Sequence, residues 1–325
     1  MYLGQEATRN RLADLTRQLI AVEWARPELK EAAQKWLDTM ADGAANKTAS
    51  ADYIKALESS IATVDELAGI EKFKAHAEEL KAKGEKFCDC DACKLVAAIL
   101  KDKEYLEKKS IWIFGGDGWA YDIGFGGVDH VLASGKDVNV FVFDTEVYSN
   151  TGGQASKSSN IGQVAQFAAA GKETKKKSLA EIAMSYGYVY VAQVAMGANP
   201  AQTLKAIQEA EAYHGPSLII GYAPCEMHSI KGGMTNCQAE MKKAVECGYW
   251  NLFRFNPAAE TDKFIVDSKE PKEEGYRAFL MNEARYSRLT REFPDRAETL
   301  FKRNEEVAMD RYQHLLKLKA MYDEK

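Results

Sequence analysis

Four short runs of apolar, largely β-branched residues constrain the fold of this chain more than any other feature. They are SIWIFG, DVNVFVFDT, YVYVAQV and SLIIGYAP. Segments with helical spacing lie between or after them: DIGFGGVDHVLASG, IGQVAQFAAAG, SLAEIAMSYG and NPAQTLKAIQEAEAYHG. Continuous apolar strands separated by helices are typical of a mostly parallel sheet with helices on both faces. We therefore predict an α/β core over residues 109–255.

Charged helical segments flank this core on both sides. Residues 1–108 show apolar residues at spacings of three and four and no β pattern, which predicts amphipathic helices. One of these is expected over residues 51–83, and Pro27 marks the start of another. Residues 256–325 contain the loop DSKEP and two further helical stretches, YRAFLMNEARYSRLTREF and RAETLFKRNEEVAMDRYQHLLKLKAMY. We expect this C-terminal tail to pack on the core.

Composition limits the possible classes of function. The chain is 46% hydrophobic and 28% charged, with a net charge of −5, which is ordinary for a soluble globular protein. No apolar run approaches the roughly 20 residues that cross a bilayer, and the N-terminus lacks a signal pattern, so we predict a cytoplasmic protein without a membrane partner. The short basic run at 175–177 is interpreted as a solvated helix start rather than a nucleic-acid-binding patch.

The sequence GGDGWAYDIG, at residues 115–124, places an acidic residue between glycines where the first predicted strand ends. Gly116 and Gly118 let the backbone turn sharply and approach a ligand closely. In parallel α/β sheets ligands bind outside the carboxyl ends of the strands, and the N-terminus of the following helix would favour a phosphate there. Taken alone, the motif is more typical of a plain tight turn between strand and helix.

The next predicted strand ends in the polar sequence DTEVYSNTGGQ, at residues 144–154. If consecutive parallel strands are neighbours, Asp117 and the turn from Thr145 to Val147 face one small volume. A carboxylate, a hydroxyl and an exposed backbone carbonyl form the hard oxygen site that Mg²⁺ prefers, and Mg²⁺ usually takes substrate phosphates as well. The sequence thus predicts a Mg²⁺ site that binds a diphosphate.

A Gly-Asp-Gly turn followed by an Asn- and Thr-rich strand end resembles the signature of the thiamine diphosphate (ThDP) fold. The longer string GGDGWAYDIGFGGVDHVLASGKDVNVFVFDTEVYSNTGGQASKSS resembles the ThDP-binding domain of the pyruvate:ferredoxin (flavodoxin) oxidoreductase family. GYVYVAQVAMGAN, GPSLIIGYAPCEMH and DSKEP resemble it too. The resemblance covers residues 105–325 strongly and the helical N-terminal third loosely. It implies that residues 1–108 are part of an insertion in the ThDP domain.

This resemblance implies roles for individual residues. Mg²⁺ would be held by Asp117, Thr145 and the main-chain carbonyl of Val147. Asn150 would face the thiazolium and the bound 2-oxoacid, where its amide can stabilise a developing oxyanion, an effect often worth about 3 kcal/mol. The remaining residues that would line the diphosphate and the thiazolium are Gly116, Gly118 and Trp119.

The implied activity is the oxidative decarboxylation of pyruvate to acetyl-CoA and CO₂, with ThDP as the reacting cofactor and coenzyme A as the acetyl acceptor. Electrons would pass through iron–sulfur clusters to ferredoxin or flavodoxin. Cys225, directly after a predicted strand, matches the fourth thiolate of the [4Fe–4S] cluster nearest ThDP. From spacing alone a buried structural thiol is the more typical interpretation. Such a cluster needs four ligands, and no segment here matches the other three.

The full enzyme of this family is much longer than this chain, and its other domains supply further catalytic and cluster-binding residues. We therefore expect an incomplete ThDP domain, either a C-terminal fragment or the product of a split gene. It would be inactive alone and would depend on the remaining domains and on a homodimer. The alternatives are the same chemistry on 2-oxoglutarate or another 2-oxoacid, and a non-catalytic assembly module. EVYSNTGGQ favours pyruvate, and the intact Asp117 and Asn150 favour cofactor binding.

The other cysteines and the histidines carry weaker signals. In the absence of a secretory signal, six cysteines predict free thiols or metal ligands rather than disulfides. The segment FCDCDAC contains a C-x-C-x-x-C motif that can be interpreted as a fragment of a metal site, although surface thiols of an insertion are the favoured interpretation of Cys88, Cys90 and Cys93. His228 is interpreted as structural, with an approach to the cluster or cofactor as the alternative. Core or surface positions are expected for Cys237 and Cys247, surface positions for His76, His214 and His314, and a packed helix position for His130.

Overall fold

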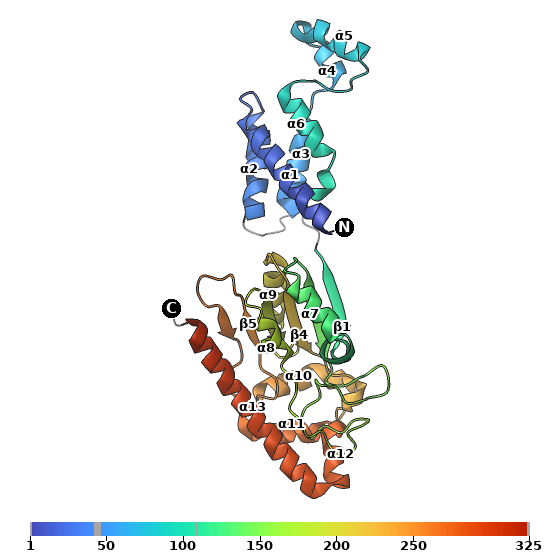
Figure 1. Cartoon of the computed structure of the whole chain (residues 1–325), viewed down its shortest axis with the longest axis vertical. Helices are drawn as coiled ribbons and strands as arrows, with labels where there is room; N and C mark the ends of the chain where they lie inside the picture. Colours follow the sequence, from blue (N-terminus) through green and yellow to red (C-terminus); the bar gives the residue numbers. More distant parts are fainter. Residues whose placement is uncertain (1, 42–46, 108–109, 324–325) are drawn as a thin grey trace. The chain divides into compact units, whose positions relative to one another are not determined.

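The computed structural model describes residues 2–41, 47–107 and 110–323, and the chain forms two compact units, Met1–Ser110 and Ile111–Lys325 (Figure 1). The predicted boundary between residues 108 and 109 falls outside the described residues. No helix in the described part of the chain is both long enough and apolar enough to span a bilayer.

In the described residues of the first unit all regular elements are helices, joined by turns and irregular segments, with an isolated bridge between Thr63 and Phe87. A bundle of four helices encloses its main core, in which Trp36 is fully buried and donates a hydrogen bond from Nε1 to the carbonyl of Leu106 at 2.8 Å. The helical elements are α1 (Tyr2–Ala21), α2 (Pro27–Ala41), α3 (Lys47–Ser60), α4 (Val64–Ala68), η1 (Glu71–Phe73), α5 (Lys74–Ala82), α6 (Asp91–Leu100) and η2 (Lys103–Tyr105).

The prediction of one helix over residues 51–83 is wrong, because the helical conformation ends with α3 and resumes in α4. Thr63 caps the new helix α4: its Oγ1 accepts from the backbone N–H of Glu66 at 3.2 Å, and the Glu66 carboxylate accepts from the backbone N–H of Thr63 at 2.7 Å. This reciprocal capping box satisfies backbone donors that a continuous helix would bond internally. The apolar spacing continues through the break, so periodicity alone did not reveal it.

The second unit contains one six-stranded sheet in the order β1-β2-β4-β3-β5-β6. The first four strands are parallel and correspond to the four apolar runs, so the predicted α/β fold is confirmed. The short strands β5 and β6 pair antiparallel and were not predicted. The strands are β1 (Trp112–Gly116), β2 (Asn139–Asp144), β3 (Tyr190–Val194), β4 (Ser217–Tyr222), β5 (Phe253–Phe255) and β6 (Phe264–Val266).

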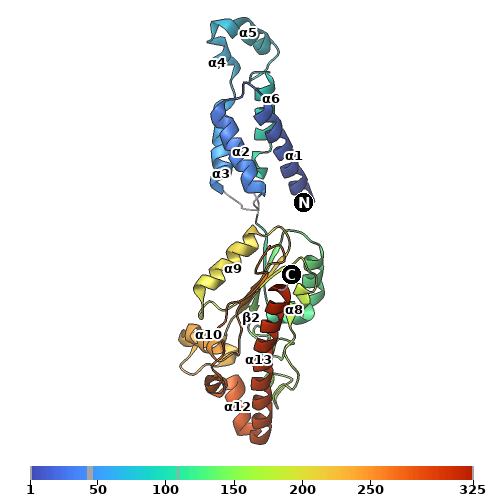
Figure 2. The same cartoon turned by 90° about the vertical axis from the view of Figure 1, so that its left-hand side faces the viewer.

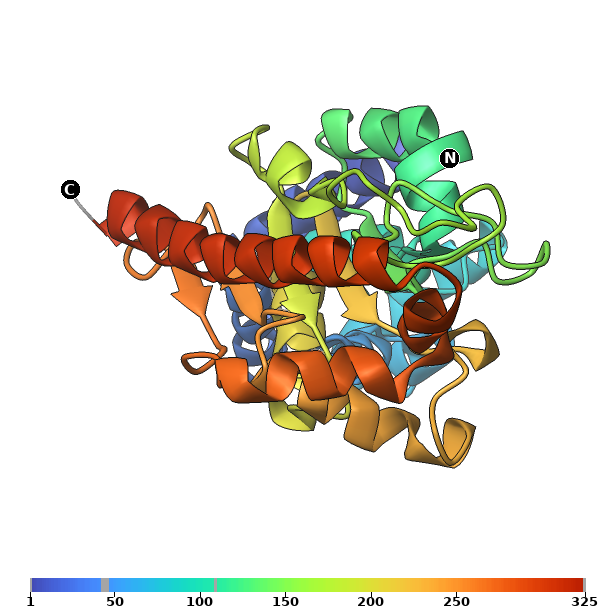
Figure 3. The same cartoon turned by 90° about the horizontal axis from the view of Figure 1, so that it is seen from below.

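Helices cover both faces of this sheet, as predicted. Alternate strand residues such as Val142 and Ile220 point into a large core shared with α7, α8, α10 and the C-terminal helices, whereas Ile219 and Ala192 point into a smaller core under α9. Figure 2 shows α8 and α9 on opposite sides of the strands, and Figure 3 shows α13 running across one face. The helical elements are η3 (Gly118–Ile123), α7 (Phe125–Ala133), α8 (Leu179–Met184), α9 (Pro200–Ala212), η4 (Glu226–His228), η5 (Met234–Asn236), α10 (Cys237–Glu246), η6 (Glu273–Gly275), α11 (Tyr276–Asn282), α12 (Ala284–Glu292) and α13 (Pro294–Asp323).

Two predicted helices of this unit differ in the structure. IGQVAQFAAAG is irregular, because Gly162 has a φ of +78°, and an added Cβ there would lie 2.9 Å from the ring of Phe301. The single helix expected from YRAFLMNEARYSRLTREF is divided into α11 and α12. Glu283 between them is extended, with φ −113° and ψ 129°.

Replacing Leu218 by Ala should lower the free energy of unfolding by about 2–5 kcal/mol, because this β4 side chain is fully buried in the large core. Urea unfolding followed by circular dichroism measures the change. Leu204→Ala is the matched control, since Leu204 is 57% exposed and should change the unfolding free energy by no more than about 0.5 kcal/mol. Equal losses in the two variants would contradict this assignment of the core.

Candidate cofactor and metal site

Asp117 lies directly after β1, with its side chain only 1% exposed. Its Oδ1 accepts hydrogen bonds from Thr145, at 3.0 Å from the backbone N–H and 2.7 Å from Oγ1. The two residues meet because β1 and β2 are parallel neighbours, with Gly116 opposite Phe143 at the strand ends. The adjacency inferred from the order of the strands is therefore present in the fold.

The carbonyl oxygen of Val147 completes a group of three oxygens. It lies 2.9 Å from Thr145 Oγ1, which itself lies 2.7 Å from Asp117 Oδ1. In an octahedral Mg²⁺ site with metal–oxygen distances of 2.0–2.1 Å, adjacent ligand oxygens are about 3 Å apart. Both distances from Thr145 Oγ1 are close to this spacing, and a carboxylate, a hydroxyl and a carbonyl have the chemistry of a divalent-cation site.

Cys225 lies close to the same group of oxygens. It comes after β4, which pairs with β2, and its Sγ lies 3.3 Å from Ser149 Oγ. Ser149 Oγ in turn lies 2.9 Å from Thr145 Oγ1. Within the described residues, Cys225 belongs to no cluster of three or more potential metal ligands; the one such cluster is in the first unit.

Ser158 is the contact to Asp117 that the sequence analysis missed. Its Oγ donates to Asp117 Oδ2, and it also lies 2.8 Å from Ser156 Oγ. Ser156 and the backbone N–H of Lys157 both donate to the carboxylate of Asp122, which fixes this loop against η3. The signal was the polar run ASKSS, but nothing in its spacing pointed back to Asp117.

The predicted tight turn after Asp117 takes a helical form, and the helix predicted over residues 122–135 begins slightly later than expected. This turn is the six-residue π-helix η3, and α7 begins only at Phe125. Gly118 has no room for a side chain, because an added Cβ would lie 2.6 Å from the ring of Tyr148, whereas the space beside Gly116 is open. Trp119 is half-buried, and Asn150 is exposed at the end of the following turn.

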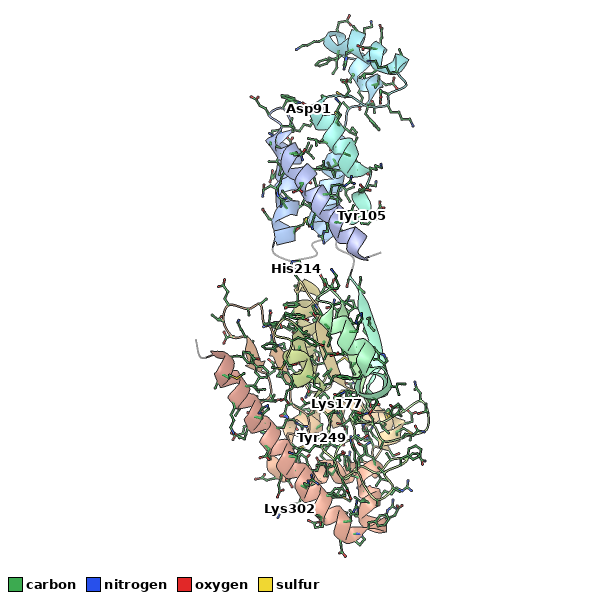
Figure 4. All side chains as sticks on the ribbon, viewed as in Figure 1. Asp91, Tyr105, Lys177, His214, Tyr249 and Lys302 are labelled. Carbon is green, nitrogen blue, oxygen red and sulfur yellow. The ribbon has the colours of Figure 1, made fainter. Side chains whose placement is uncertain are left out.

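A buried network of charges holds the Thr145–Val147 turn from inside. Lys176 Nζ lies 2.7 Å from Asp144 Oδ2 and 2.9 Å from Glu146 Oε1, and Arg285 lies 2.9 Å from Glu146 Oε2. Burial by itself would raise the pKa of Glu146, but Lys176 and Arg285 outweigh it and lower the pKa to about 2. Burial raises the pKa of Asp144 to about 6, against the opposing effect of Lys176. Tyr249, labelled in Figure 4, also donates to the Glu146 carboxylate inside this unit.

Glu146 has a φ of +59°, a conformation that non-glycine residues rarely adopt. Its backbone carbonyl accepts from Ser159 Oγ at 2.5 Å and from Gln163 Nε2 at 3.0 Å. This anchoring turns the Glu146 side chain inward, whereas Thr145 and Val147 contribute oxygens to the candidate site.

The histidines occupy different environments. His228 is fully buried, and its Nδ1 accepts from the backbone N–H of Cys225 at 2.9 Å. Burial lowers the pKa of His228 well below its ordinary value, and Arg285 adds to the effect. The packed position expected for His130 is wrong, because that side chain is exposed. His76, His214 and His314 are exposed as expected, Cys247 is buried, and Cys237 is partly buried.

The part of the chain that contains the candidate metal site matches a known protein family. Residues 92–220 match the family model "Thiamine pyrophosphate enzyme, C-terminal TPP binding domain". The matched segment extends from α6 to β4. It includes Asp117, Thr145, Val147 and Asn150, and it ends before Cys225.

The chain is 46% identical over 321 residues to pyruvate-flavodoxin oxidoreductase of Klebsiella pneumoniae, a match that covers 98% of this chain and 25% of that protein. It is 60% identical over 227 residues to pyruvate:ferredoxin oxidoreductase of Moorella thermoacetica, covering 69% of this chain and 19% of that protein. A solved 2-oxoglutarate:ferredoxin oxidoreductase from Magnetococcus marinus is 26% identical with a TM-score of 0.32, and the match covers 34% of this chain and 38% of that one. The chain therefore belongs to the family of pyruvate:ferredoxin and pyruvate-flavodoxin oxidoreductases, and it spans a quarter or less of the length of these two pyruvate relatives.

Proposed function

We propose that this chain is the ThDP- and Mg²⁺-binding part of an enzyme that oxidatively decarboxylates pyruvate to acetyl-CoA and CO₂ and passes the electrons to ferredoxin or flavodoxin. The observation that carries the proposal is the convergence of Asp117, Thr145 and the carbonyl of Val147 at the ends of two neighbouring strands. This convergence lies within the segment that matches a TPP-binding domain. The names of the Klebsiella and Moorella relatives support pyruvate as substrate and ferredoxin or flavodoxin as electron acceptor.

ThDP, when bound, supplies the nucleophilic carbon that attacks a 2-oxoacid and takes up the electrons left as CO₂ departs. The residues of this chain bind and orient. Asp117, Thr145 and Val147 would hold Mg²⁺ against the diphosphate, and the open space beside Gly116 leaves room for the phosphate oxygens. The exposed amide of Asn150 would donate a hydrogen bond to the oxygen of the reacting carbonyl.

Cys225 is proposed as one thiolate ligand of a [4Fe–4S] cluster next to the cofactor. Its sulfur is partly buried and, through Ser149, lies two short contacts from Thr145. Electron transfer between cofactor and cluster needs this closeness. Because such clusters need four cysteine ligands, the proposal requires the other three to come from the rest of the enzyme.

Further domains and a second copy of the enzyme are proposed as partners of this chain. The β1–β2 edge of the sheet carries aromatic side chains that remain uncovered in the chain: Phe114 is 61% exposed and Phe143 is 45% exposed. Their rings stack with centroids 6.2 Å apart. Grouped exposed apolar side chains of this kind mark surfaces that other protein parts cover.

Replacing Asp117 by Asn should weaken ThDP binding in the presence of Mg²⁺ by at least about tenfold, because the substitution removes the anionic metal ligand. Thr145→Val should act in the same direction by removing the hydroxyl. Isothermal titration of the chain measures both affinities. Thr151→Val is the control, since its exposed hydroxyl bonds only Gln154 among the contacts described. Unchanged affinity in the Asp117 variant would refute the metal assignment.

Replacing Asn150 by Ala in the complete enzyme should lower kcat with pyruvate about 10²-fold and leave ThDP affinity unchanged, because the amide acts on the reacting oxygen. Pyruvate-dependent reduction of flavodoxin or ferredoxin measures the rate. A parallel assay with 2-oxoglutarate tests the substrate. A preference for 2-oxoglutarate, or full activity of the variant, would count against this part of the proposal.

The stability of the chain should fall as the pH drops below about 6.5, in part because His228 stays neutral when folded but takes up a proton when unfolded. Its contribution is present in full above that pH and is lost by up to about 1.4 kcal/mol per pH unit below it. His228→Asn, which keeps an acceptor for the Cys225 N–H, should flatten this dependence. Urea unfolding between pH 5 and 7.5 gives the curves, with exposed His214→Asn as the control. Parallel curves for wild type and His228→Asn would show that His228 is not the titrating group.

A further inference from the structure

We propose that Cys88, Cys90 and Cys93 bind one Zn²⁺ ion through their three sulfurs. The ion would join a small helical lobe, residues 61–90, to the bundle of the first unit. The proposed function assigns no role to these residues, although the family match over residues 92–220 includes Cys93. The site is therefore independent of the candidate site around Asp117.

The spacing of the sulfurs fits a single ion. The three Sγ atoms lie within 4.8 Å of one another. Tetrahedral Zn²⁺ with Zn–S bonds of 2.3 Å places its sulfur ligands about 3.8 Å apart, so small side-chain adjustments are enough to close the site. In a [4Fe–4S] cluster each thiolate binds a different iron, which sets the sulfurs further apart. The grouping therefore favours a mononuclear thiophilic ion.

The backbone around the sulfurs is arranged to stabilise thiolates. The N–H of Cys90 points to Cys88 Sγ at 3.4 Å, and the N–H of Cys93 points to Cys90 Sγ at 3.5 Å. Cys90 is also the N-cap of the ten-residue helix α6, whose positive end favours a negative sulfur.

The lobe has too small a core to be stable without a cross-link. Only four of its apolar side chains form a buried cluster: Val64, Leu67, Ala77 and Leu80. Modules below about 40 residues usually need a disulfide, a metal or a partner, because their core buries too little surface. A structural metal would provide this missing stability.

The three sulfurs lie near the point where the segment that enters the lobe meets the segment that leaves it. The backbone N–H of Cys88 donates to the carbonyl oxygen of Ala62 at 2.9 Å, and the backbone N–H of Val64 donates to the carbonyl oxygen of Lys86 at 3.1 Å. Cys88 packs against the core of the lobe, whereas Cys93 is on α6. An ion bound to both would therefore link the lobe directly to α6 of the bundle.

Three protein thiolates leave one coordination position open. His76 does not occupy this position, because its Nε2 is paired with Asp89 Oδ1 at 2.7 Å and its ring nitrogens do not belong to the group that the three sulfurs form. We assign the fourth position to water. The ion would therefore remain accessible to exchange, unlike one in a closed site with four protein ligands.

The test uses the full 325-residue chain, purified anaerobically with reductant, stripped of metal and titrated with Co²⁺ as a spectroscopic substitute for Zn²⁺. We expect one Co²⁺ per chain to show the sulfur-to-cobalt charge-transfer absorption and the intense visible bands of a tetrahedral thiolate site, and we expect Zn²⁺ to displace it. Cys88→Ser, Cys90→Ser and Cys93→Ser should each weaken binding by at least about tenfold, and the triple variant should abolish it. Cys237→Ser is the matched control and should leave the spectrum unchanged.

A second measurement separates loss of metal from loss of fold. Hydrogen exchange should show that Zn²⁺ protects amides of residues 61–93 in the wild type and in Cys237→Ser, but not in the triple variant. Amides of the bundle around Trp36 should stay protected in all three. The proposal is overturned if reduced wild-type chain gives no thiolate–cobalt absorption, if binding survives the triple substitution, or if the chain carries a Cys90–Cys93 disulfide and takes up no metal after reduction.

Discussion

The candidate cofactor site depends on the carboxylate of Glu146, which is held inside the second unit by Lys176, Arg285 and Tyr249. Buried charges are costly unless they are paired, and removing one partner of such a group typically costs about 3–5 kcal/mol. Here the pairing fixes a residue with positive φ between the two residues that offer oxygens to a cation. The same turn therefore places the Glu146 carboxylate in the buried charge network and the oxygens of Thr145 and Val147 in the candidate metal site. Lys176 and Arg285 come from distant parts of the sequence, so the site can form only after the loop and the C-terminal helices have packed.

The sequence was sufficient for the part of the site that follows from sheet geometry. Parallel neighbouring strands must end at the same edge, so the meeting of Asp117 and Thr145 could be predicted from two strand ends alone. Ser158 and Glu146 could not be assigned their contacts in this way, because they lie in or next to an irregular loop whose course is set by distant partners such as Arg285 and Gln163. The same limit explains the fold errors. Thr63 and Gly162 interrupt apolar spacings that, by periodicity alone, would continue as helices.

The two units differ in the size of the apolar cores that stabilise them. The second unit has a large core on one face of its sheet and a smaller one on the other, and it can accommodate a costly buried charge network. In the first unit the bundle around Trp36 has a sizeable core, but the lobe that follows α3 does not. The clustering of three thiols at the base of that lobe is consistent with a need for chemical rather than hydrophobic stabilisation.

The exposed aromatic side chains of the sheet have a consequence for association. In the described part of the chain β1 is the outermost strand, and the exposed rings of Phe114 and Phe143 lie on β1 and its neighbour β2. An edge strand with apolar side chains pairs readily with the same edge on another chain unless it is covered. A form of this chain produced by itself should therefore aggregate more readily than a form in which this edge is covered.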